Sequence, residues 1–189
     1  MDNKKKMPQV ITISGRMGSG KDTLANYIEE ELTKVGCRVL ITHYADLLKY
    51  ILKQYFDWDG KKNDLGRWLL QHVGTDIFRN QYDENFWCSF VGVIIYLFGE
   101  KWDYVIIPDA RFENEVESMK AWFDATSINV TRENTPEELS IHTEHESEHG
   151  LDEYEFDLTF ENDKGLEEMK EYAKNVAGLV LFNRVNNDN

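Results

Sequence analysis

The fold is decided by the stretch Val10-Ile11-Thr12-Ile13-Ser14-Gly15-Arg16-Met17-Gly18-Ser19-Gly20-Lys21-Asp22-Thr23. The β-branched run at its start predicts a buried strand. The glycine-rich part has the G-x-x-x-x-G-K spacing of a phosphate-binding loop. An amphipathic helix is predicted directly after it, because four apolar residues fall on one helical face: Leu24, Ile28, Leu32 and Val35. Strand, loop and helix in this order predict a site for nucleotide phosphates, and a plain glycine turn before a helix is the alternative.

The residues of this loop differ in their expected contacts. Lys21 is expected to reach the outer phosphates of a nucleotide. Asp22 stands where the general motif has a Ser or Thr that binds Mg²⁺, and it could serve the ion directly or through water. Thr23 could bond an inner phosphate.

The rest of the chain alternates short apolar strands with amphipathic helices. Strands are predicted at 38–42, 104–107, 127–130, 156–160 and 179–182, and helices at 46–56, 67–78, 84–98, 112–123 and 166–176. A mobile connection is expected at 57–66 and a polar loop or flap at 132–152. This alternation predicts one α/β domain over residues 1–189, with a mostly parallel sheet covered by helices on both faces.

Composition limits the classes of partner. The 189 residues include 21 Lys and Arg against 35 Asp and Glu, a formal charge of −14 that argues against nucleic-acid polymers and anionic membranes as partners. Hydrophobic residues make up 41%, enough for a sizeable core. Two cysteines, Cys37 and Cys88, are far apart and fit a reducing compartment. The apolar run Phe90 to Phe98 is too short to span a membrane and is interpreted as a buried helix, with part of a homodimer face as the alternative. A soluble, cytoplasmic protein is expected.

Charged residues outside the loop suggest further contacts with anions. Asp109 and Arg111 follow the predicted strand at 104–107, where the carboxyl ends of parallel strands form a ligand crevice. Arg67 and Gln71 share a helix face, which suits an anion, although a solvated helix explains them equally well. Three histidines could hold a transition metal, but a polar flap is the preferred interpretation: His142, His145 and His149.

In their order and spacing these blocks resemble the phage-type deoxynucleoside monophosphate kinases of the P-loop kinase superfamily. The resemblance rests on Gly15–Thr23, Arg67–Gln71 with Gly74–Asp76, Asp103–Arg111, His145–Leu151, and Asn162-Asp163. The Lys-Asp-Thr ending of the loop, unusual for the general motif, is normal in that family. The resemblance implies a three-layer P-loop kinase fold with a five-stranded sheet, a substrate-binding helical insertion at about 45–98 and a lid at about 132–152.

The resemblance further implies transfer of the γ-phosphoryl group of ATP to a deoxynucleoside 5′-monophosphate, with Mg²⁺ as the cofactor. The catalytic residues would be Lys21, Asp109, Arg111 and Arg132, with Asp22 and Asp109 at the metal. ATP would be held by Gly15, Arg16, Met17, Gly18, Ser19, Gly20, Lys21, Asp22, Thr23, Asn162 and Asp163. The monophosphate would be held by Asp46, Lys49, Arg67, Gln71, Gly74, Thr75, Asp76, Arg79, Arg111, His145, Ser147 and Glu148.

Other functions remain open on the sequence alone. A P-loop kinase for another small acceptor, such as dephospho-coenzyme A or phosphomevalonate, shares parts of this pattern. A regulatory module that binds and hydrolyses a nucleotide is a further alternative, and the number of arginines beyond those one nucleotide needs argues mildly against it. A non-catalytic structural protein is disfavoured by the phosphate loop.

Overall fold

The computed structural model describes residues 6–133, 147 and 149–187. Its five strands form one sheet in the order β2-β3-β1-β4-β5, and every neighbouring pair is parallel. The strands are β1 (Gln9–Ser14), β2 (Val39–Ile41), β3 (Tyr104–Ala110), β4 (Thr126–Thr131) and β5 (Leu158–Glu161). The predicted five-stranded α/β sheet is confirmed.

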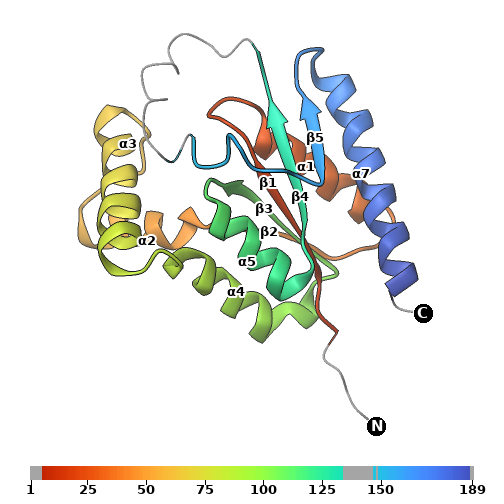
Figure 1. The fold of residues 1–189 in the computed structure, drawn as a ribbon, viewed down its shortest axis with the longest axis horizontal. Helices are drawn as coiled ribbons and strands as arrows, with labels where there is room; N and C mark the ends of the chain where they lie inside the picture. Colours follow the sequence, from red (N-terminus) through yellow and green to blue (C-terminus); the bar gives the residue numbers. More distant parts are fainter. Residues whose placement is uncertain (1–5, 134–146, 148, 188–189) are drawn as a thin grey trace.

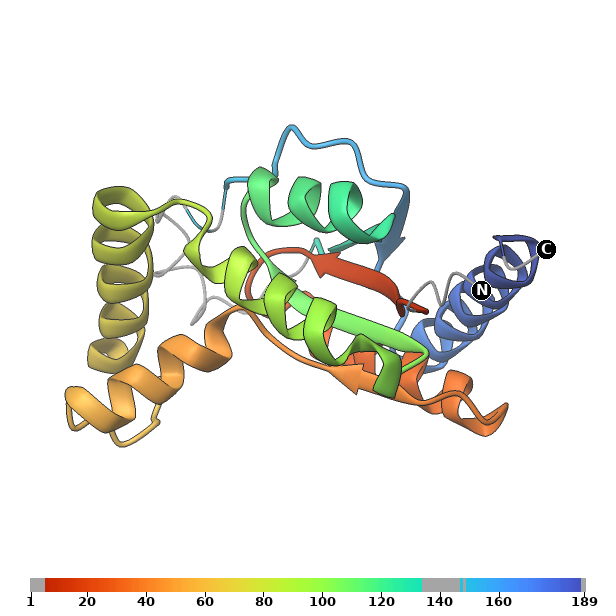
Figure 2. The same ribbon diagram turned by 90° about the horizontal axis from the view of Figure 1, so that it is seen from below.

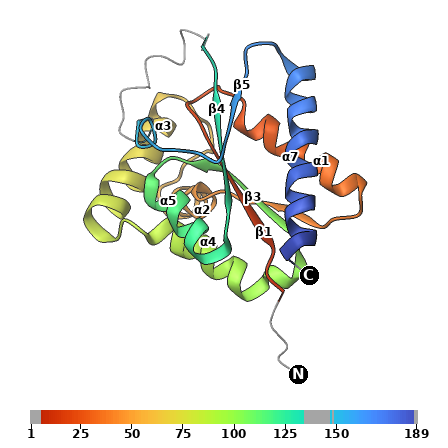
Figure 3. The ribbon, with the colours of Figure 1, turned by 45° about the vertical axis from the view of Figure 1, so that its right-hand side comes forward.

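Helices cover both faces of this sheet (Figures 1 and 3). The helical elements are α1 (Lys21–Lys34), α2 (Ala45–Tyr55), α3 (Asp64–Gln71), the π-helix η1 (His72–Tyr82), α4 (Phe86–Phe98), the 3₁₀ turn η2 (Gly99–Lys101), α5 (Glu113–Phe123) and α7 (Leu166–Asn187). One buried cluster joins α2, α4 and α5 to the sheet through residues such as Val105 and Ile107. The other joins α1 and α7 to the opposite face through residues such as Ile11 and Ile106. Adjacent residues of one strand thus serve both cores, which is why the central strands are apolar throughout.

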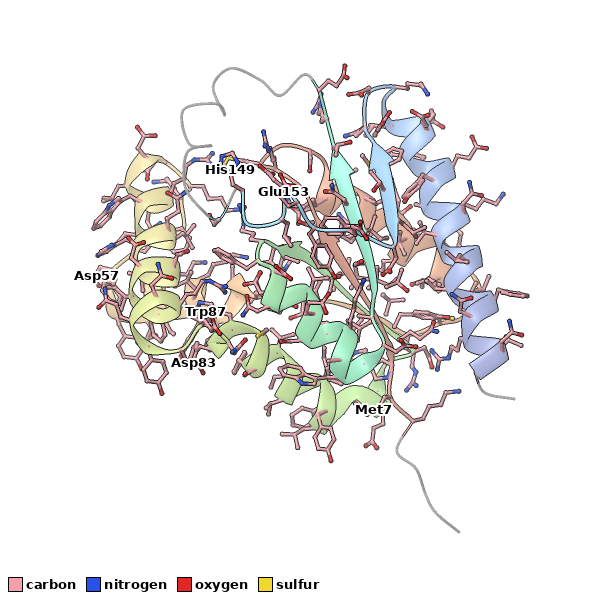
Figure 4. The ribbon with its side chains drawn as sticks, viewed as in Figure 1. Met7, Asp57, Asp83, Trp87, His149 and Glu153 are labelled. Carbon is pink, nitrogen blue, oxygen red and sulfur yellow. The ribbon has the colours of Figure 1, made fainter. Side chains whose placement is uncertain are left out.

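The helices α2, α3 and η1 extend beside the sheet as an arm, seen at the left of Figure 2, and α2 connects this arm to the core. The indole of Trp87 at the start of α4 donates to the carbonyl oxygen of Gly74 in η1 at 3.0 Å and so joins α4 to the arm. A Cβ atom on Gly74 would lie 2.6 Å from Leu48 of α2, so this glycine lets the two helices pack closely. Figure 4 shows Trp87 at this junction.

Several local predictions were wrong. Residues Leu179–Phe182 are not a strand but part of α7, because Val176, Ala177 and Val180 bury one helical face while Leu179 and Phe182 face solvent. The single helix predicted at 67–78 is instead α3 followed directly by the π-helix η1, and Gly74–Asp76 lie inside η1. Helix α4 is buried on one side only: Trp87, Cys88, Val91 and Ile95 are buried, whereas Phe90, Val93, Tyr96 and Leu97 are exposed.

Strand register sets the position of the site. Ser14 at the end of β1 lies opposite Ala110 of β3 and Asn129 of β4. The segments that follow these three strands therefore meet at one edge of the sheet, as the parallel arrangement requires. Over the described part of the chain, no helix is both long and apolar enough to cross a membrane.

Candidate active site

The loop between β1 and α1 is shaped for close backbone approach. Gly15 has a φ of 139° and a Cβ atom there would lie 2.2 Å from the carbonyl oxygen of Val130. Gly20 has a φ of 105°, and its Cβ atom would meet the amide nitrogen of Asn162 at 2.7 Å. No other residue fits these two positions without displacing the loop. The geometry is that of a backbone cradle at a helix N-terminus, the arrangement that binds phosphate.

Lys21 is buried and folded back onto this loop. Its Nζ atom donates to the carbonyl oxygens of Gly15 and, at 2.9 Å, of Arg16. These contacts hold the ammonium group at the mouth of the cradle, where it can meet a phosphate oxygen.

Asn162, predicted at the nucleotide, and Arg132, predicted as catalytic, support the loop from outside, and Asp163 links the segments from which they come. The amide of Asn162 donates to the carbonyl oxygen of Ser19 at 2.7 Å, and Arg132 donates to that of Gly18 at 3.3 Å. The carboxylate of Asp163 accepts from the backbone N–H of Glu133 at 3.1 Å. The segments after β4 and β5 are thus tied to the phosphate loop.

Asp22 points outward from the first turn of α1, and its side chain is 77% exposed. His43 lies beside it, with Nε2 3.3 Å from Oδ1 of Asp22. The hydrogen bond to His43 lowers the pKa of Asp22, and the same bond raises the pKa of His43. Asp22 is therefore ionised at neutral pH and offers carboxylate oxygens to the cavity.

Asp109 joins the end of β3 to the start of α2. Its two carboxylate oxygens accept from the backbone N–H groups of Tyr44 at 2.9 Å and Ala45 at 3.0 Å. A carboxylate at a helix N-terminus is favourable because it satisfies otherwise unpaired N–H groups. The oxygens keep lone pairs for a metal-bound water, but their orientation is fixed by the helix.

Glu115 of α5 is a buried acid of the site. Its carboxylate accepts from the backbone N–H groups of Arg111 at 2.8 Å and Phe112 at 3.2 Å and so caps α5. Burial raises the pKa of Glu115 from 4.5 to about 7. The Arg111 guanidinium donates to the carbonyl oxygen of Ser147 at 3.3 Å, and both Arg111 and Glu115 line the cavity described next.

A cavity of about 310 Å³ lies between the phosphate loop and the arm, and we call it the α3-side cavity. Arg67 of α3 crosses toward the loop and donates to the sulfur of Met17 at 2.8 Å. The cavity collects predicted residues of both substrates: Met17, Gly18, Lys21, Asp22, Lys49, Arg67, Gln71, Gly74, Thr75, Arg79, Asp109, Arg111 and Ser147.

Three residues predicted at the monophosphate have other contacts. The Arg79 guanidinium lies 3.7 Å from the ring centre of Phe112 and donates to Oδ1 of Asn114 at 2.7 Å. Asp76 contacts His72 at 2.9 Å. Asp46 accepts from Lys49 at 2.9 Å. Arg79 reaches the cavity wall, whereas Asp46 and Asp76 do not line it.

A second cavity of about 460 Å³, the β4-side cavity, lies on the other side of Arg111 and Ser147. It is lined by parts of the phosphate loop and by Arg132, and it is covered by the segment around Leu151. The segment is held by Asp152, which accepts from Arg16 at 2.9 Å and contacts His149 at 2.8 Å. Figure 4 shows His149 at this end of the sheet.

The predictions for His142, His145 and Glu148 fall outside the described residues. In the ranges that the structure does describe, no group of three or more His, Cys, Asp or Glu residues could hold a metal ion.

Sequence reasoning missed several residues that line the α3-side cavity, among them His43, Lys62 and Glu115. A signal existed for Glu115, since it stands four residues after Arg111 in the first turn of a predicted helix. His43 follows a predicted strand at the ligand edge of the sheet. Lys62 gave no signal, because it lies in a polar stretch beside another lysine.

The fold and the loop define a class, the P-loop kinases. The chain superposes on the APS kinase of Mycobacterium tuberculosis solved with AMPPNP and APS, with a TM-score of 0.55, 11% identity, and coverage of 92% of this chain and 98% of that one. A gluconokinase from Sinorhizobium meliloti gives a TM-score of 0.51 at 13% identity, with coverage of 97% and 99%. These likenesses concern the fold.

Residues 58–173 match the family model described as deoxynucleotide monophosphate kinase, and the chain belongs to this family. The deoxynucleotide monophosphate kinase of Enterobacteria phage T4 is 37% identical over 116 residues, which are 60% of this chain and 46% of that protein. The chain thus matches about half the length of this curated relative.

Proposed function

We propose that this protein transfers the γ-phosphoryl group of ATP to a deoxynucleoside 5′-monophosphate. The observation that carries the proposal is that Arg67, from the arm, and Lys21, from the phosphate loop, line one cavity. Two anions can therefore be bound face to face, one on the loop and one against the arm, with Arg111 between them. The family membership and the phage T4 relative support a monophosphate as the second anion.

The residues present fit ATP and Mg²⁺. The tight backbone cradle around Gly15 and Gly20 suits a polyphosphate. The ionised, outward-facing carboxylate of Asp22 suits a hard cation that is held mainly by substrate phosphates and water. When bound, Mg²⁺ would neutralise charge on the β- and γ-phosphates.

In the proposed reaction, the protein aligns two phosphates and stabilises the charge that develops between them. Lys21 binds the outer phosphate oxygens of ATP. Arg111 stabilises the group in transfer, and Arg67 holds the acceptor phosphate. No strong general base is needed, because the acceptor oxygen is already ionised near neutral pH. Ser147 lines both cavities, and the segment around Ser147 and Leu151 would shield the reacting phosphates from water and so suppress hydrolysis.

A coupled assay with ATP, Mg²⁺ and each common ribo- and deoxyribonucleoside monophosphate tests this proposal. We expect diphosphate product from at least one deoxynucleotide. Lys21→Ala should lower turnover by about 10²-fold, the scale of a lost charge-stabilising donor. Lys34→Ala is the matched control, because Lys34 lies at the far end of the same helix and pairs with Glu31.

The alternatives give different results in the same assay. Phosphorylation of dephospho-coenzyme A or phosphomevalonate, with no product from any nucleotide, would indicate a kinase for another acceptor. ATP hydrolysis that no acceptor converts into transfer would indicate a regulatory module.

The metal role of Asp22 has its own test. Asp22→Ala should raise the Mg²⁺ concentration needed for half-maximal binding of ADP, measured by calorimetry, and leave binding without Mg²⁺ nearly unchanged. An unchanged Mg²⁺ titration would remove Asp22 from the metal site.

We further propose that residues 45–98 act as the acceptor-binding insertion and residues 132–152 as the lid of one kinase domain over 1–189. Such an enzyme would act in the cytoplasm, and in the host cytoplasm if a phage encodes it. Its substrates are small molecules, and the net charge of −14 disfavours binding to a nucleic-acid polymer or a membrane surface.

The outer face of α4 supports a homodimer. This face is apolar (Phe90, Val93, Tyr96 and Leu97), and Trp122 of α5 packs beside it against Gly92. No charged residue lies between Glu84 and Glu100, so α4 itself adds no charge repulsion between two copies of this acidic chain. Each of these side chains is roughly half exposed, which gives on the order of 500 Å² of apolar area. A standard interface buries about 800 Å² per partner, so this patch can form its centre.

Light scattering tests the homodimer. We expect a mass twice the 22.2 kDa of the chain, and a monomer for Leu97→Asp. Phe182→Asp, on the exposed face of α7, is the matched control and should stay dimeric. A wild-type monomer at micromolar concentration, or capture of a different partner with no self-association, would overturn the proposal.

A further inference from the structure

The connection between α2 and α3 is not the mobile linker that its polar sequence predicts. Trp58 is buried, its backbone N–H donates to the carbonyl oxygen of Leu52 at 3.2 Å, and its indole donates to the carbonyl oxygen of Lys61 at 3.0 Å. Gly66 of α3 packs on the same carbonyl, since a Cβ atom there would lie 2.0 Å from it. The backbone on the N-terminal side of Lys62 is therefore anchored to both helices.

The other side of Lys62 is anchored as well. Asn63 is the N-cap of α3, and its side chain accepts from the backbone N–H of Gly66 at 2.9 Å. Such a cap stabilises a helix start by about 1 kcal/mol. With both flanking residues held, the backbone fixes the direction in which the side chain of Lys62 leaves the chain.

The two adjacent lysines of this connection face different surroundings. Lys61 pairs with Asp59 at 2.8 Å and is 77% exposed. Lys62 lines the α3-side cavity together with Lys21, Asp22 and Arg67. Because the backbone is anchored on both sides, the side chains of Lys61 and Lys62 leave it in different directions, and only Lys62 is positioned at the cavity.

Lys62 adds positive charge near Asp22, in the first turn of α1. The hydrogen bond from His43 is the main cause of the lowered pKa of Asp22, and the positive charge of Lys62 contributes in the same direction. Other cations at the cavity wall are engaged by protein oxygens: Lys49 by Asp46, and Arg79 by Asn114 and the carbonyl oxygen of Glu84. Lys62 thus adds positive charge where an anion must enter between arm and loop.

We propose that Lys62 binds the phosphate group of the acceptor monophosphate, as a substrate-binding residue delivered by the anchored α2–α3 connection. This proposal rests on the proposed function, because it assigns a residue to the acceptor of that reaction. Lys62 comes from the same arm as Arg67 and faces the same cavity, so the two cations can hold one phosphate from two sides. A flexible ammonium group suits this task, since it meets a phosphate without the planar geometry that arginine requires.

The test compares Lys62→Ala with Lys62→Arg and with the matched control Lys61→Ala. Steady-state kinetics with ATP, Mg²⁺ and the best deoxynucleotide give KM for each substrate, and calorimetry gives the Kd of the monophosphate without ATP. We expect Lys62→Ala to raise both the KM and the Kd of the monophosphate about tenfold, the effect of losing one charge-assisted hydrogen bond. The KM of ATP should change less than about twofold, and Lys62→Arg should restore most of the affinity.

Lys61→Ala should match the wild type in every measurement, and the Tm of all three variants should be unchanged because both lysines are exposed. The KM of the monophosphate should also rise less steeply with salt in Lys62→Ala than in the wild type. Equal effects of Lys61→Ala and Lys62→Ala, a change in the KM of ATP alone, or no change at all would overturn the role of Lys62 while leaving the proposed function intact. A wild-type protein that forms no diphosphate from any monophosphate, and binds none, would overturn both.

Discussion

Replacing the buried acid of the site by Glu115→Gln should stabilise the protein relative to the wild type, and this gain should increase as the pH rises from mildly acidic to neutral. Burial raises the pKa of Glu115 from 4.5 to about 7. Between these values the folded state keeps a proton that the unfolded state loses, so stability falls as pH rises through this window. Below pH 4.5 the cost is absent, and above pH 7 it is complete. A difference of about 2.5 pKa units corresponds to about 3 kcal/mol.

Glutamine removes this titration while keeping an oxygen that accepts from the backbone N–H groups of Arg111 and Phe112. Urea denaturation of both proteins from pH 4.5 to pH 8 gives the free energy of unfolding at each pH. We expect the wild type to lose about 3 kcal/mol relative to Glu115→Gln across this range. Glu113→Gln, an exposed acid in the first turn of the same helix, is the control and should show no such trend. A difference between Glu115→Gln and the wild type that is constant with pH would refute the reasoning.

Three further changes have definite expected outcomes. Gly20→Ala should lower the free energy of unfolding by about 1–3 kcal/mol and raise the KM of ATP, because the φ of Gly20 is 105° and the new Cβ atom would meet Asn162. The control Gly36→Ala has a φ of 87° with open space around it and should cost only about 1 kcal/mol in thermal denaturation. Asp103→Asn should lower the free energy of unfolding by about 1 kcal/mol above pH 4, a modest value because the pair with Arg38 is partly exposed. This loss should shrink as pH falls toward 2, because hydrogen bonds from Arg38 are the main cause that lowers the pKa of Asp103 to about 2. Raising salt from 50 to 500 mM should weaken monophosphate binding several-fold in calorimetry, whereas salt-independent binding would contradict capture by a local cluster of cations.

The phosphate loop could be predicted because its signal is local. Strand, glycines, Lys21 and the apolar face of α1 follow one another within about one supersecondary unit, and each obeys its own rule. The parallel sheet followed from the same alternation, and it brought Asp109 and Arg111 to the loop as expected, because parallel strands end at one edge.

The errors arose where packing between distant segments decides the outcome. The run Leu179–Phe182 is short and apolar, and only its contact with α1 and the sheet distinguishes a helix from a strand. Lys61 and Lys62 are chemically identical, so their different surroundings depend on the anchoring of Trp58, which is not visible in a polar stretch. The arm in turn supplies half of the cavity, and its position follows from contacts such as that between Trp87 and Gly74.

The two hydrogen bonds from Tyr44 and Ala45 to Asp109 give the arm a point about which it can rotate. Both bonds end on one carboxylate, so they tie the start of α2 to the end of β3 at Asp109. A rotation of the arm about that point displaces a group in proportion to its distance from it. A rotation of a few degrees at the first turn of α2 would hardly move Tyr44. The same rotation would displace the more distant Lys62 and Arg67 much further, so small changes at Asp109 would have larger effects at the far wall of the cavity.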